Sequence, residues 1–559
     1  MPVDVARIRS DIEAIALCTQ TPGAGATRPT FSDSWGASIR YIRDQAVKAG
    51  AVVRSDAAGN LHARARSLAP DQSVWLCGSH LDTVPHGGNY DGVVGVVVAL
   101  ELLRNGLALE LVVFAEEEGT TFSMGMLGSR AWTGQLGAAQ LCALRNDAGQ
   151  SYLEAGAKYG VEPAKMADDR LRPPAYRGMI EVHIEQGPRM WNRGEPLAVV
   201  SAIAGRRQYL VRIRGTANHA GTTSMHDRRD ALAGAAEIMV ALERIAVGET
   251  VLTVGRLINH PNAVNVIPDS VEFTVDFRAA SDAALTRGDT EIRRVIEEIC
   301  HRRKLALEIQ LTESMAACPM DAQLCDQLSR LGKLPVTHSG ALHDSAVFAG
   351  HIPTVMLFVR SRDGISHHPD EFSRVEDIAA AADLVGQMIR RPTLSRLNSM
   401  TREEFVGVCG PFFEHSPWIA DRAWLQRPFA SAGDLYEKLC AVVEAATPEE
   451  KLKLIRAHPD LVGRMARENR LSRESASEQA AAGLTSLSAD EIAVFERHNA
   501  EYTQRFGFPF VVCARQNRKQ AILDAFPRRL AHSREEEIAS ALAEIFKIAR
   551  LRLADAIGE

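Results

Sequence analysis

Up to about Gly205, short apolar runs alternate with helix-like stretches, and this alternation restricts the fold more than any other feature of the sequence. Runs that read as strands lie at residues 74–77, 109–115, 179–183 and 354–359, with a helix-like stretch at 92–103. Strands that alternate with helices form a mainly parallel sheet with helices on both faces. We therefore predict an α/β domain in this part of the chain.

Between residues 206 and 314 the order of the elements changes. Strands are expected at residues 208–214, 251–258, 271–278 and 306–311, and helices at 228–246 and 289–303. This β-α-β-β-α-β order describes a compact α+β unit. The alternating pattern resumes afterwards and ends with a helix at 375–389, so the unit is an insertion. We expect an α/β domain made of residues 1–205 and 315–395, with an α+β lid domain, residues 206–314, inserted into it.

Beyond about residue 398, helical periodicity replaces the alternation. A threonine cap followed by proline starts one helix at Thr447. That helix must end near His458, because Pro459 disfavours helical geometry in the residue before it. A long amphipathic helix follows at 535–557. We predict a separate all-α domain over residues 398–559.

The composition is that of an ordinary globular protein and excludes several classes of partner. The net charge is −6 over 559 residues, of which 46% are hydrophobic and 24% charged, so no basic nucleic-acid platform is indicated. The strongest apolar run, residues 93–103, is too short to span a bilayer. Nine cysteines without a Cys-x-x-Cys pair argue against a disulfide framework or a thiolate zinc site. We expect a cytoplasmic protein with no nucleic-acid or membrane partner.

Ionisable residues follow four of the predicted strands, where the carboxyl ends of the strands meet at one edge of a sheet. They are His80 and Asp82, Glu116 to Glu118, His183, and His367, joined by Asp91 on a turn that opens a helix. Three histidines with aspartate and glutamate suit Zn²⁺ or Mn²⁺. The Asp82 carboxylate points the same way as His80 in an extended segment and is expected to orient its ring. Each segment alone also fits a polar turn or a solvated loop, but their combination predicts a metal site.

Five motifs in this part of the chain resemble one family of metalloenzymes. They are Gly-Ser-His-Leu-Asp-Thr-Val (78–84), Asn-Tyr-Asp-Gly (89–92), Glu-Glu-Glu-Gly (116–119), His-Ile-Glu-Gln-Gly (183–187) and Gly-Ile-Ser-His (364–367). Residues 5–395 are thereby identified as a member of the zinc-dependent hydantoinase/carbamoylase family, within the aminoacylase/carboxypeptidase superfamily. His183, with Gln186 after it, favours this branch over the peptidases.

The resemblance implies a dinuclear centre that holds two Zn²⁺ or Mn²⁺ ions. The ligands it implies are Asp91, shared by both ions, His80 and His183 for one ion, and Glu118 and His367 for the other. It also makes Glu117 the general base and Gln186 a substrate-binding residue, although spacing alone leaves the choice among the three glutamates open. Two cations close together activate a water molecule and polarise the carbonyl group that it attacks.

The inserted domain carries residues that the same resemblance assigns to the substrate. Residues 215–223 are similar to a lid motif in which a histidine, here His219, stabilises a tetrahedral oxyanion across a dimer interface. Asn265 and Arg278 match positions that bind a substrate carboxylate, a task that suits a planar arginine. Apart from the family, Arg278 also fits an ion pair with Asp276. The resemblance thus implies a homodimer formed through the lid.

In the helical part, Arg552 continues an apolar stripe along the last helix, where a charge requires a partner or an anionic ligand. The position of His458 at a helix C-terminus favours its imidazolium form. Taken alone, these residues and Glu478 also fit a snorkelling arginine, a capping histidine and a surface glutamate.

Five motifs in the helical part together resemble 2-oxo-4-hydroxy-4-carboxy-5-ureidoimidazoline (OHCU) decarboxylases. They lie at residues 412–418, 457–461, 475–484, 506–510 and 551–553. The resemblance implies that His458 and Glu478 are catalytic, that Ser475 and Arg552 bind substrate, and that no metal or cofactor takes part. The alternative is that the helical domain is a non-catalytic assembly module.

The two resemblances together imply related steps on small ureide substrates derived from purines. The decarboxylase would yield (S)-allantoin, a separate allantoinase would open its ring, and the N-terminal part would hydrolyse allantoate to ureidoglycine, ammonia and CO₂. Two positions near substrate-facing loops depart from the family, Ser224 in place of proline and Leu342 in place of glycine. They leave open another ureido or N-carbamoyl acid, such as ureidoglycolate, as the substrate.

Overall fold

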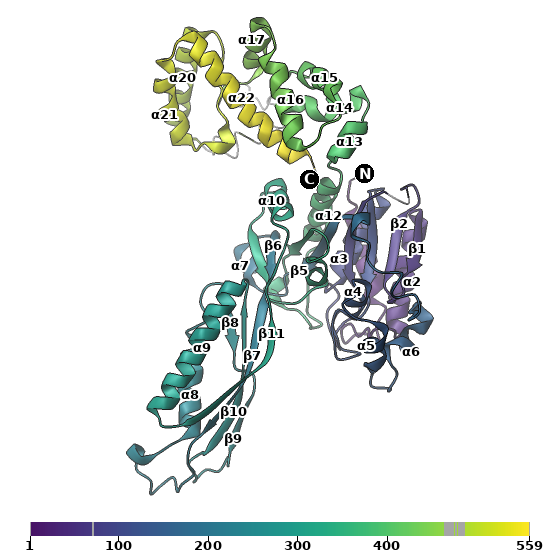
Figure 1. The fold of residues 1–559 in the computed structure, drawn as a ribbon, viewed down its shortest axis with the longest axis vertical. Coiled ribbons are helices and arrows are strands. Elements are labelled where there is room, and N and C mark those ends of the chain that lie inside the picture. The colour runs from purple at the N-terminus through teal and green to yellow at the C-terminus, as the bar shows by residue number, and fades with distance from the viewer. Residues whose placement is uncertain (1, 70–71, 463–474, 476–477, 479–486, 558–559) are drawn as a thin grey trace. The chain divides into compact units, whose positions relative to one another are not determined.

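The computed structural model describes residues 2–69, 72–462, 475, 478 and 487–557, and its fold is drawn in Figure 1. The chain divides into two compact units, Met1–Arg390 and Arg391–Glu559. Each unit has a hydrophobic core of its own. Among the helices in these ranges, none combines the length and the apolar character that crossing a membrane requires.

A nine-stranded mixed sheet forms the centre of the first unit, in the order β1-β2-β4-β3-β5-β14-β6-β12, with β13 beside β6. Its strands are β1 Ala51–Ser55, β2 Leu61–Ala65, β3 Val74–His80, β4 Leu109–Phe114, β5 Tyr176–Ile184, β6 Leu197–Ile203, β12 Cys318–Pro319, β13 Val336–Ser339 and β14 Thr354–Val359. The helices around it are α1 Val5–Ala16, α2 Asp33–Lys48, α3 Val93–Arg104, α4 Leu127–Trp132, α5 Ala138–Ala143, α6 Tyr152–Gly156, α7 Arg189–Arg193, α10 Ala322–Gly332, α11 Ser345–Phe348 and α12 Val375–Ile389.

The middle of this sheet is parallel and its edges are largely antiparallel. β3 pairs in parallel with β4 and β5, and β5 pairs in parallel with β14. The pairs β1–β2, β2–β4, β14–β6 and β12–β6 are antiparallel. The sheet is therefore less parallel than the sequence predicts. At β1 and β2 the reason is the short turn at residues 56–60, which cannot contain the crossover that parallel neighbours need.

Close packing holds the ends of β3 and β5 in place. Every side chain of β3, β4 and β14 is buried, as expected for strands covered on both faces. Helix α3 approaches the sheet at Gly95, where a Cβ atom would lie 2.6 Å from the carbonyl oxygen of Val182 and 2.7 Å from the Cβ of Ser79. Both atoms belong to residues next to a predicted metal ligand, so this contact fixes the strand ends that carry His80 and His183.

The inserted lid is a five-stranded sheet in the order β11-β7-β10-β8, with β9 also paired to β10. Its elements are β7 Gly205–Arg214, α8 Ala231–Glu243, β8 Val251–Thr253, β9 Leu257–His260, β10 Ser270–Ala279, α9 Asp282–Arg302 and β11 Ala306–Met315. The single strand predicted at residues 251–258 is divided into β8 and β9, which pair with opposite ends of β10. Helix α9 begins at Asp282 rather than at residue 289, because the Ser281 side chain accepts a hydrogen bond from the Ala284 amide and caps it.

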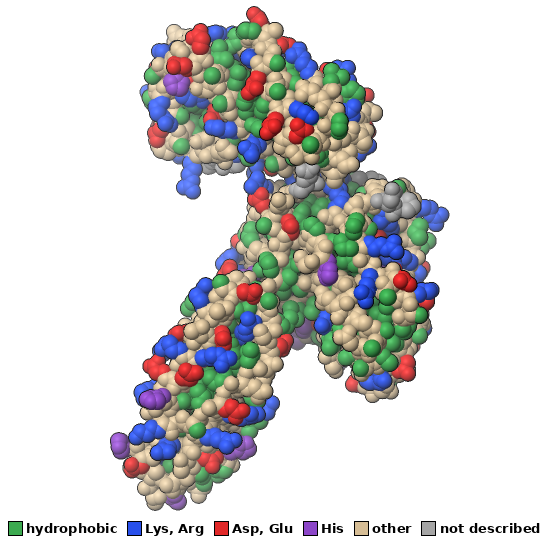
Figure 2. Space-filling model, viewed as in Figure 1, with side chains coloured by type: hydrophobic (Ala, Val, Ile, Leu, Met, Phe, Trp, Pro, Cys, Tyr) green, Lys and Arg blue, Asp and Glu red, His purple; other side chains and the backbone are tan. Residues whose placement is uncertain are grey.

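Helices α8 and α9 cover one face of the lid sheet (Figure 1). The other face carries polar side chains such as Arg212, Glu272 and Glu308. Alternate residues of β10 are buried, among them Phe273 and Phe277. On the polar face the Arg212 guanidinium pairs with the carboxylates of Glu272 and Glu308. Figure 2 shows basic and acidic side chains interspersed over the side of the lid that is turned to the viewer, so no field of a single sign gathers there.

The described residues of the second unit form helices, short 3₁₀ turns and loops, with no strand among them. The helices are α13 Leu394–Ser399, α14 Arg402–Cys409, α15 Trp418–Ala423, α16 Ala432–Glu444, α17 Pro448–Ala457, α20 Ala489–Phe506, α21 Lys519–Leu530 and α22 Arg534–Ala556. Helix α17 has the predicted Thr447 cap and ends at His458. Of the motif at 475–484, only Ser475 and Glu478 lie within the described residues.

The separate cores predict that damage to one unit leaves the other intact. Phe405 is fully buried and stacks on Phe429 in the second core. We expect Phe405→Ala to reduce the free energy of unfolding of the helical unit by about 3–5 kcal/mol, because it leaves a cavity. Differential scanning calorimetry should show one transition lowered and the other unchanged. Leu425→Ala, at a side chain that is 68% exposed, is the control. A shift of both transitions by Phe405→Ala would contradict independent cores.

Candidate functional site

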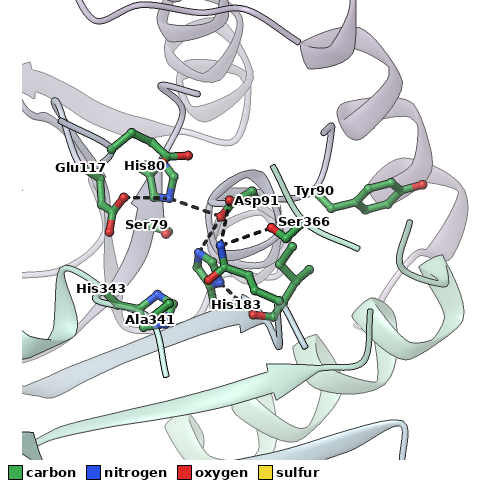
Figure 3. A network of polar contacts seen from close by, with 12 residues as sticks. Ser79, His80, Tyr90, Asp91, Glu117, His183, Ala341, His343 and Ser366 are labelled. Carbon is green, nitrogen blue, oxygen red and sulfur yellow. Dashed lines mark hydrogen bonds and ion pairs between the residues drawn. The ribbon is translucent and has the colours of Figure 1, made fainter. Parts of the chain in front are cut away.

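The carboxyl ends of the central strands bring the predicted metal ligands together. Figure 3 shows three of them, His80, Asp91 and His183, beside Glu117. His80 is the last residue of β3, Glu117 and Glu118 follow β4, and His183 lies near the end of β5. Asp91 comes just before α3, and His367 lies on the loop after β14. Together with Gln186 these residues are adjacent in space, although up to 287 positions separate them in the sequence.

The Asp91 carboxylate lies between two sets of possible ligands. Its Oδ1 is 3.1 Å from His183 Nε2 and 3.7 Å from His80 Nε2. Its Oδ2 is 3.1 Å from His367 Nε2, which in turn is 3.4 Å from Glu118 Oε2. Within each set the donor atoms lie within 4.8 Å of one another. The two oxygens of one carboxylate therefore face two different ligand sets.

Backbone carbonyl groups fix the protonation of the two buried imidazoles. His80 Nδ1 lies 3.1 Å from the carbonyl oxygen of Asp82, and His183 Nδ1 lies 3.0 Å from that of Ile184. A carbonyl oxygen only accepts, so each Nδ1 carries a proton, and Nε2 is the ring nitrogen that faces the site. His183 Nε2 is buried and lies 3.1 Å from Asp91 Oδ1. This orientation, with Nδ1 held by the backbone and Nε2 turned into the site, is the one that a metal-binding histidine requires.

Asp82 orients His80 differently from the sequence-based expectation. The carbonyl group of Asp82, not its carboxylate, bonds to the ring, and the nearer carboxylate oxygen is 3.7 Å away. The other carboxylate oxygen accepts from the Glu118 amide at 3.0 Å. Asp82 thus joins the ends of β3 and β4, and burial raises its pKa to about 6.

The electrostatics of the site favour a bound cation. Burial, followed by the nearby Asp91, raises the pKa of Glu118 to about 8. Burial and then Glu118 raise the pKa of Glu117 well above its ordinary value. Burial opposes ionisation of Asp91 too, but the imidazoles of His183 and His367 outweigh it and lower its pKa. Crowded carboxylates with unpaired buried oxygens and imidazole lone pairs are a donor set that fits divalent cations.

The structure distinguishes the three consecutive glutamates that the sequence leaves equivalent. Glu116 turns away and accepts hydrogen bonds from the amides of Thr121 and Phe122 at 2.7 and 2.8 Å. Glu117 and Glu118 line the same cavity of about 410 Å³ as Asp91 and His183. Glu117 Oε2 is 3.7 Å from His80 Nε2 and is not part of either ligand set. Its place beside the ligands suits a general base.

A closed chain of hydrogen bonds, which the sequence did not indicate, supports Asp91. Glu371 accepts from the Tyr90 and Asp91 amides at 2.9 and 3.0 Å through Oε1, and from the Ser366 hydroxyl at 3.0 Å through Oε2. Gln186 Nε2 then donates to Ser366 Oγ at 3.3 Å and to Asp91 Oδ2 at 3.0 Å. Glu371 is 4% exposed, and its only signal in the sequence is its place four residues after His367.

A second buried carboxylate, Glu181, supports the other side of the site. It accepts from the Ser79 hydroxyl at 2.8 Å, and from the amide and the hydroxyl of Ser345 at 2.9 and 2.5 Å. Ser79 precedes His80, and Glu181 itself lies two residues before His183 on β5. Glu181 therefore joins the two strands that carry the buried imidazoles.

The lid contributes one of its three predicted substrate residues to this cavity. Arg278 lines it, and also pairs with Asp276 at 2.9 Å and donates to the Gly340 carbonyl group at 2.9 Å. His219 and Asn265 are exposed and do not line the cavity. Of the two departures from the family, Leu342 lines the cavity, whereas Ser224 donates to Asp227 outside it.

In the helical unit, Arg552 is the centre of a second polar cluster. Its guanidinium binds Glu478 through two hydrogen bonds of 2.8 Å. It also donates to the Pro411 carbonyl group at 2.9 Å and to Ser475 Oγ at 3.2 Å, and lies 3.0 Å from Glu414 Oε2. These five contacts engage all of its N–H groups. Glu414, 3% exposed, lies inside the motif at 412–418, and its role in this cluster is not evident from the sequence.

His458 lies beside this cluster but does not have the charge that its helix end suggests. Its Nδ1 is 3.0 Å from the Leu454 carbonyl oxygen, and its Nε2 is buried without a hydrogen-bond partner among the described residues. Burial lowers its pKa to about 4, which outweighs the effect of the helix terminus. The expectation of an imidazolium is therefore wrong for this state. A small cavity of about 30 Å³ joins His458, Ser475, Glu478 and Arg552.

Comparisons with known proteins extend over both units. The sequence profile of peptidase family M20/M25/M40 matches residues 76–391, and that of OHCU decarboxylase matches residues 398–554. N-carbamoyl-L-amino acid amidohydrolase of Geobacillus stearothermophilus is 36% identical over 384 residues, which cover 65% of this chain and 92% of that one. Allantoate amidohydrolase of Escherichia coli K12 is 32% identical over 385 residues, covering 66% and 93%.

A solved structure shows the same relationship. It is an amidase of the hydantoinase/carbamoylase family from Burkholderia multivorans, 31% identical, with a TM-score of 0.64, covering 69% of this chain and 97% of that one. The fold and the paired ligand sets define the first unit as a hydrolase of the metal-dependent α/β class. The chain belongs to peptidase family M20/M25/M40, and it carries an OHCU decarboxylase domain. Both resemblances predicted from the sequence are confirmed.

The support of Asp91 predicts a selective loss of metal. We expect Glu371→Ala to remove at least half of the bound metal, because both Asp91 and the loop that carries His367 lose their anchor. Metal content after dialysis, measured by mass spectrometry, tests this. Asp370→Asn, next to it in sequence with a side chain that is 73% exposed, should keep the full content. Full metal content in the Glu371 variant would contradict the supporting role.

The neutral state of His458 predicts a pH dependence of stability. Its pKa falls from an ordinary 6.5 to about 4 on folding. The unfolded chain therefore binds more protons between these pH values, and stability is lost as the pH falls from 6.5 towards 4. The full effect is about 3 kcal/mol in the free energy of unfolding of the helical unit. Urea titrations from pH 7 to 4.5 should show it, and the slope should be smaller in His458→Gln. Equal slopes would show that other groups cause the dependence.

Proposed function

We propose that the N-terminal unit hydrolyses a urea-type C–N bond of an anionic ureido acid, with allantoate as the preferred substrate. The observation that carries this proposal is the Asp91 carboxylate, which faces two ligand sets in a cavity that also contains guanidinium groups. Two divalent cations, Zn²⁺ or Mn²⁺, suit these sets. The relative named allantoate amidohydrolase supports the choice of substrate. The decarboxylase domain on the same chain supports it as well, since (S)-allantoin is the cyclic form of allantoate.

The residues around the cavity have distinct roles in this proposal. When bound, the cations polarise the substrate carbonyl group and make a water molecule more acidic. Glu117 accepts the proton of the attacking water and returns it to the leaving nitrogen. Gln186 holds Asp91 in its shared position, and Arg278 approaches the substrate from the lid.

A homodimer formed through the lid is part of the same proposal. His219 and Asn265 are exposed on the lid and do not line the cavity of their own chain. They can meet a substrate only if a second copy presents its cavity to them, or if the lid moves. In a homodimer, His219 of one copy would lie at the cavity of the other copy, where it can stabilise the oxyanion that its motif implies. The cysteines within the described residues are all free, which supports a reducing compartment such as the cytoplasm.

For the helical domain we propose cofactor-free decarboxylation of OHCU to (S)-allantoin. The imidazoline ring itself takes up the electrons released when CO₂ leaves. His458 Nε2 is an acceptor in a neutral ring, so it takes a proton or a hydrogen bond from the substrate. Arg552 holds Glu478 through two bonds. Because all its donors are engaged, Arg552 binds a substrate carboxylate only by exchanging a partner. The product, (S)-allantoin, is the compound whose ring a separate allantoinase would open, so we expect a functional link to that enzyme.

A second substrate class has one specific observation in its favour. Leu342 lines the cavity together with Met126 and Met315. Such apolar contacts suit the side chain of an N-carbamoyl amino acid, the class named for the Geobacillus relative. Ammonia release from allantoate, ureidoglycolate and N-carbamoyl amino acids, compared at equal concentration, distinguishes the two.

Two variants should separate the activities. Glu117→Gln should lower ammonia release from allantoate by about 10²–10⁴-fold, since it removes the proton acceptor, and should leave OHCU decay unchanged. His458→Ala should instead abolish OHCU decay and leave ammonia release from allantoate unchanged. Coupled ammonia detection and the ultraviolet decay of OHCU measure the two reactions on the same preparation. Unchanged decarboxylation in His458→Ala would favour the non-catalytic assembly module instead.

A further inference from the structure

The cavity that contains Glu117 and the metal-ligand residues has three guanidinium groups in its wall, those of Arg130, Arg206 and Arg278. Two of them come from the lid, on the neighbouring strands β7 and β10, where they stand opposite each other in the register. Arg130 comes from α4 of the catalytic part. An anionic substrate needs at least one of these cations to be available for binding.

The two lid arginines already have carboxylate partners. Arg278 bonds through Nε to Asp276 at 2.9 Å and through a terminal nitrogen to the Gly340 carbonyl oxygen at 2.9 Å. Arg206 is paired with Glu313 and lies 4.0 Å from Asp276. For either one, binding a substrate carboxylate competes with an existing ion pair.

Arg130 has no such competitor. It is half-buried, and it makes no hydrogen bond, ion pair or ring contact through its side chain with any residue that the structure describes. A guanidinium with five open donors in a partly dehydrated wall is suited to a planar anion, which it can bind through two parallel hydrogen bonds. No partner has to be displaced first.

The backbone around Arg130 ties it to the end of β4. The amides of Met126, Leu127 and Gly128 donate to the carbonyl groups of Glu117, Glu116 and Ala115 at 3.0, 3.0 and 2.8 Å. At Gly128 a Cβ atom would lie 2.7 Å from the Ala115 amide nitrogen, so this close return requires glycine. One residue before Arg130, the Ser129 hydroxyl donates to the buried Asp344 at 2.6 Å. The segment that carries Arg130 is therefore held directly against the segment that carries Glu117 and Glu118.

We propose that Arg130 binds the carboxylate of the ureido-acid substrate and makes the enzyme selective for acids over neutral ureides. The inference rests on the proposed hydrolysis of such acids. It gives the catalytic part its own anion-binding group, at a fixed place relative to Glu117, in addition to any contact from the lid. Arg278 then adds to binding when the lid approaches, at the expense of its pair with Asp276.

The test compares substrates that differ only in the charge of one group. Allantoate and its carboxamide, and N-carbamoylglycine and its carboxamide, are given to the full-length, metal-loaded enzyme. We expect Arg130→Gln to lower kcat/KM for each acid at least about tenfold, mainly by raising KM. The kcat/KM for each carboxamide should change less than about twofold. Arg130→Lys should recover part of the loss. Arg193→Gln, at an exposed arginine of α7 outside the cavity, is the matched control and should match the parent.

A binding measurement separates failure of this inference from failure of the proposed function. Isothermal titration of N-carbamoylglycine into metal-loaded Glu117→Gln, with and without Arg130→Gln, requires no turnover. Weaker binding in the double variant supports the role of Arg130. An equal fall in activity for acids and carboxamides, or no change at all, overturns that role while the hydrolase assignment stands. If the parent neither hydrolyses nor binds any ureido acid, the proposed function fails, and the inference fails with it.

Discussion

The crowding of buried carboxylates around Asp91 governs the rest of the first unit. Acidic side chains at residues 82, 91 and 116–118 meet where most water is excluded, and the pKa values of all but Asp91 are raised. Such a cluster is stable only with compensating positive charge nearby. Part of this charge is on His183 and His367, whose pKa values Asp91 raises to about 9 against the effect of burial. Divalent cations, which this donor set fits, would complete the balance.

Two different kinds of scaffold present the ligands. His80 and His183 are on buried strands joined by Glu181, so the packing of the sheet fixes their positions. His367 and Gln186 lie on loops, each with a positive φ of 56°, which a residue with a side chain rarely adopts. The Glu371 hydrogen bonds hold these loops in that conformation. One half of the site is thus determined by the core and the other by a polar network.

Much of the candidate site could be predicted from the sequence, because strand–helix alternation places strand ends at one edge of a sheet. Residues as distant as His80 and His367 were expected to meet for that reason alone. The supporting residues were not predictable in this way. Glu371 and Glu181 lie close in sequence to His367 and His183, but this proximity does not reveal their role, which depends on the segments that pack against them. The Asp82 carbonyl group, not its carboxylate, bonds to the His80 ring, and residue type does not reveal this choice.

Charge states were harder to predict than positions. The cap at Thr447 and Pro459 locate the helix that ends at His458. The imidazole of His458 is nevertheless neutral, because the effect of burial on its pKa outweighs that of the helix terminus. Arg552 was expected to need a partner on its apolar stripe, and the structure supplies four, including the unforeseen Glu414. In the lid, the strand predicted at 251–258 is divided because β8 and β9 pair with different parts of β10, a tertiary choice.

The unequal exposure of the histidines has a consequence for how the enzyme is supplied with its ions. The side chain of His367 is 47% exposed, whereas those of His80 and His183 are at most 2% exposed. Solvent therefore reaches one ligand set far more easily than the other. Of two ions held by these sets, the one at His367 would therefore exchange with the surrounding medium sooner than the one at the buried imidazoles.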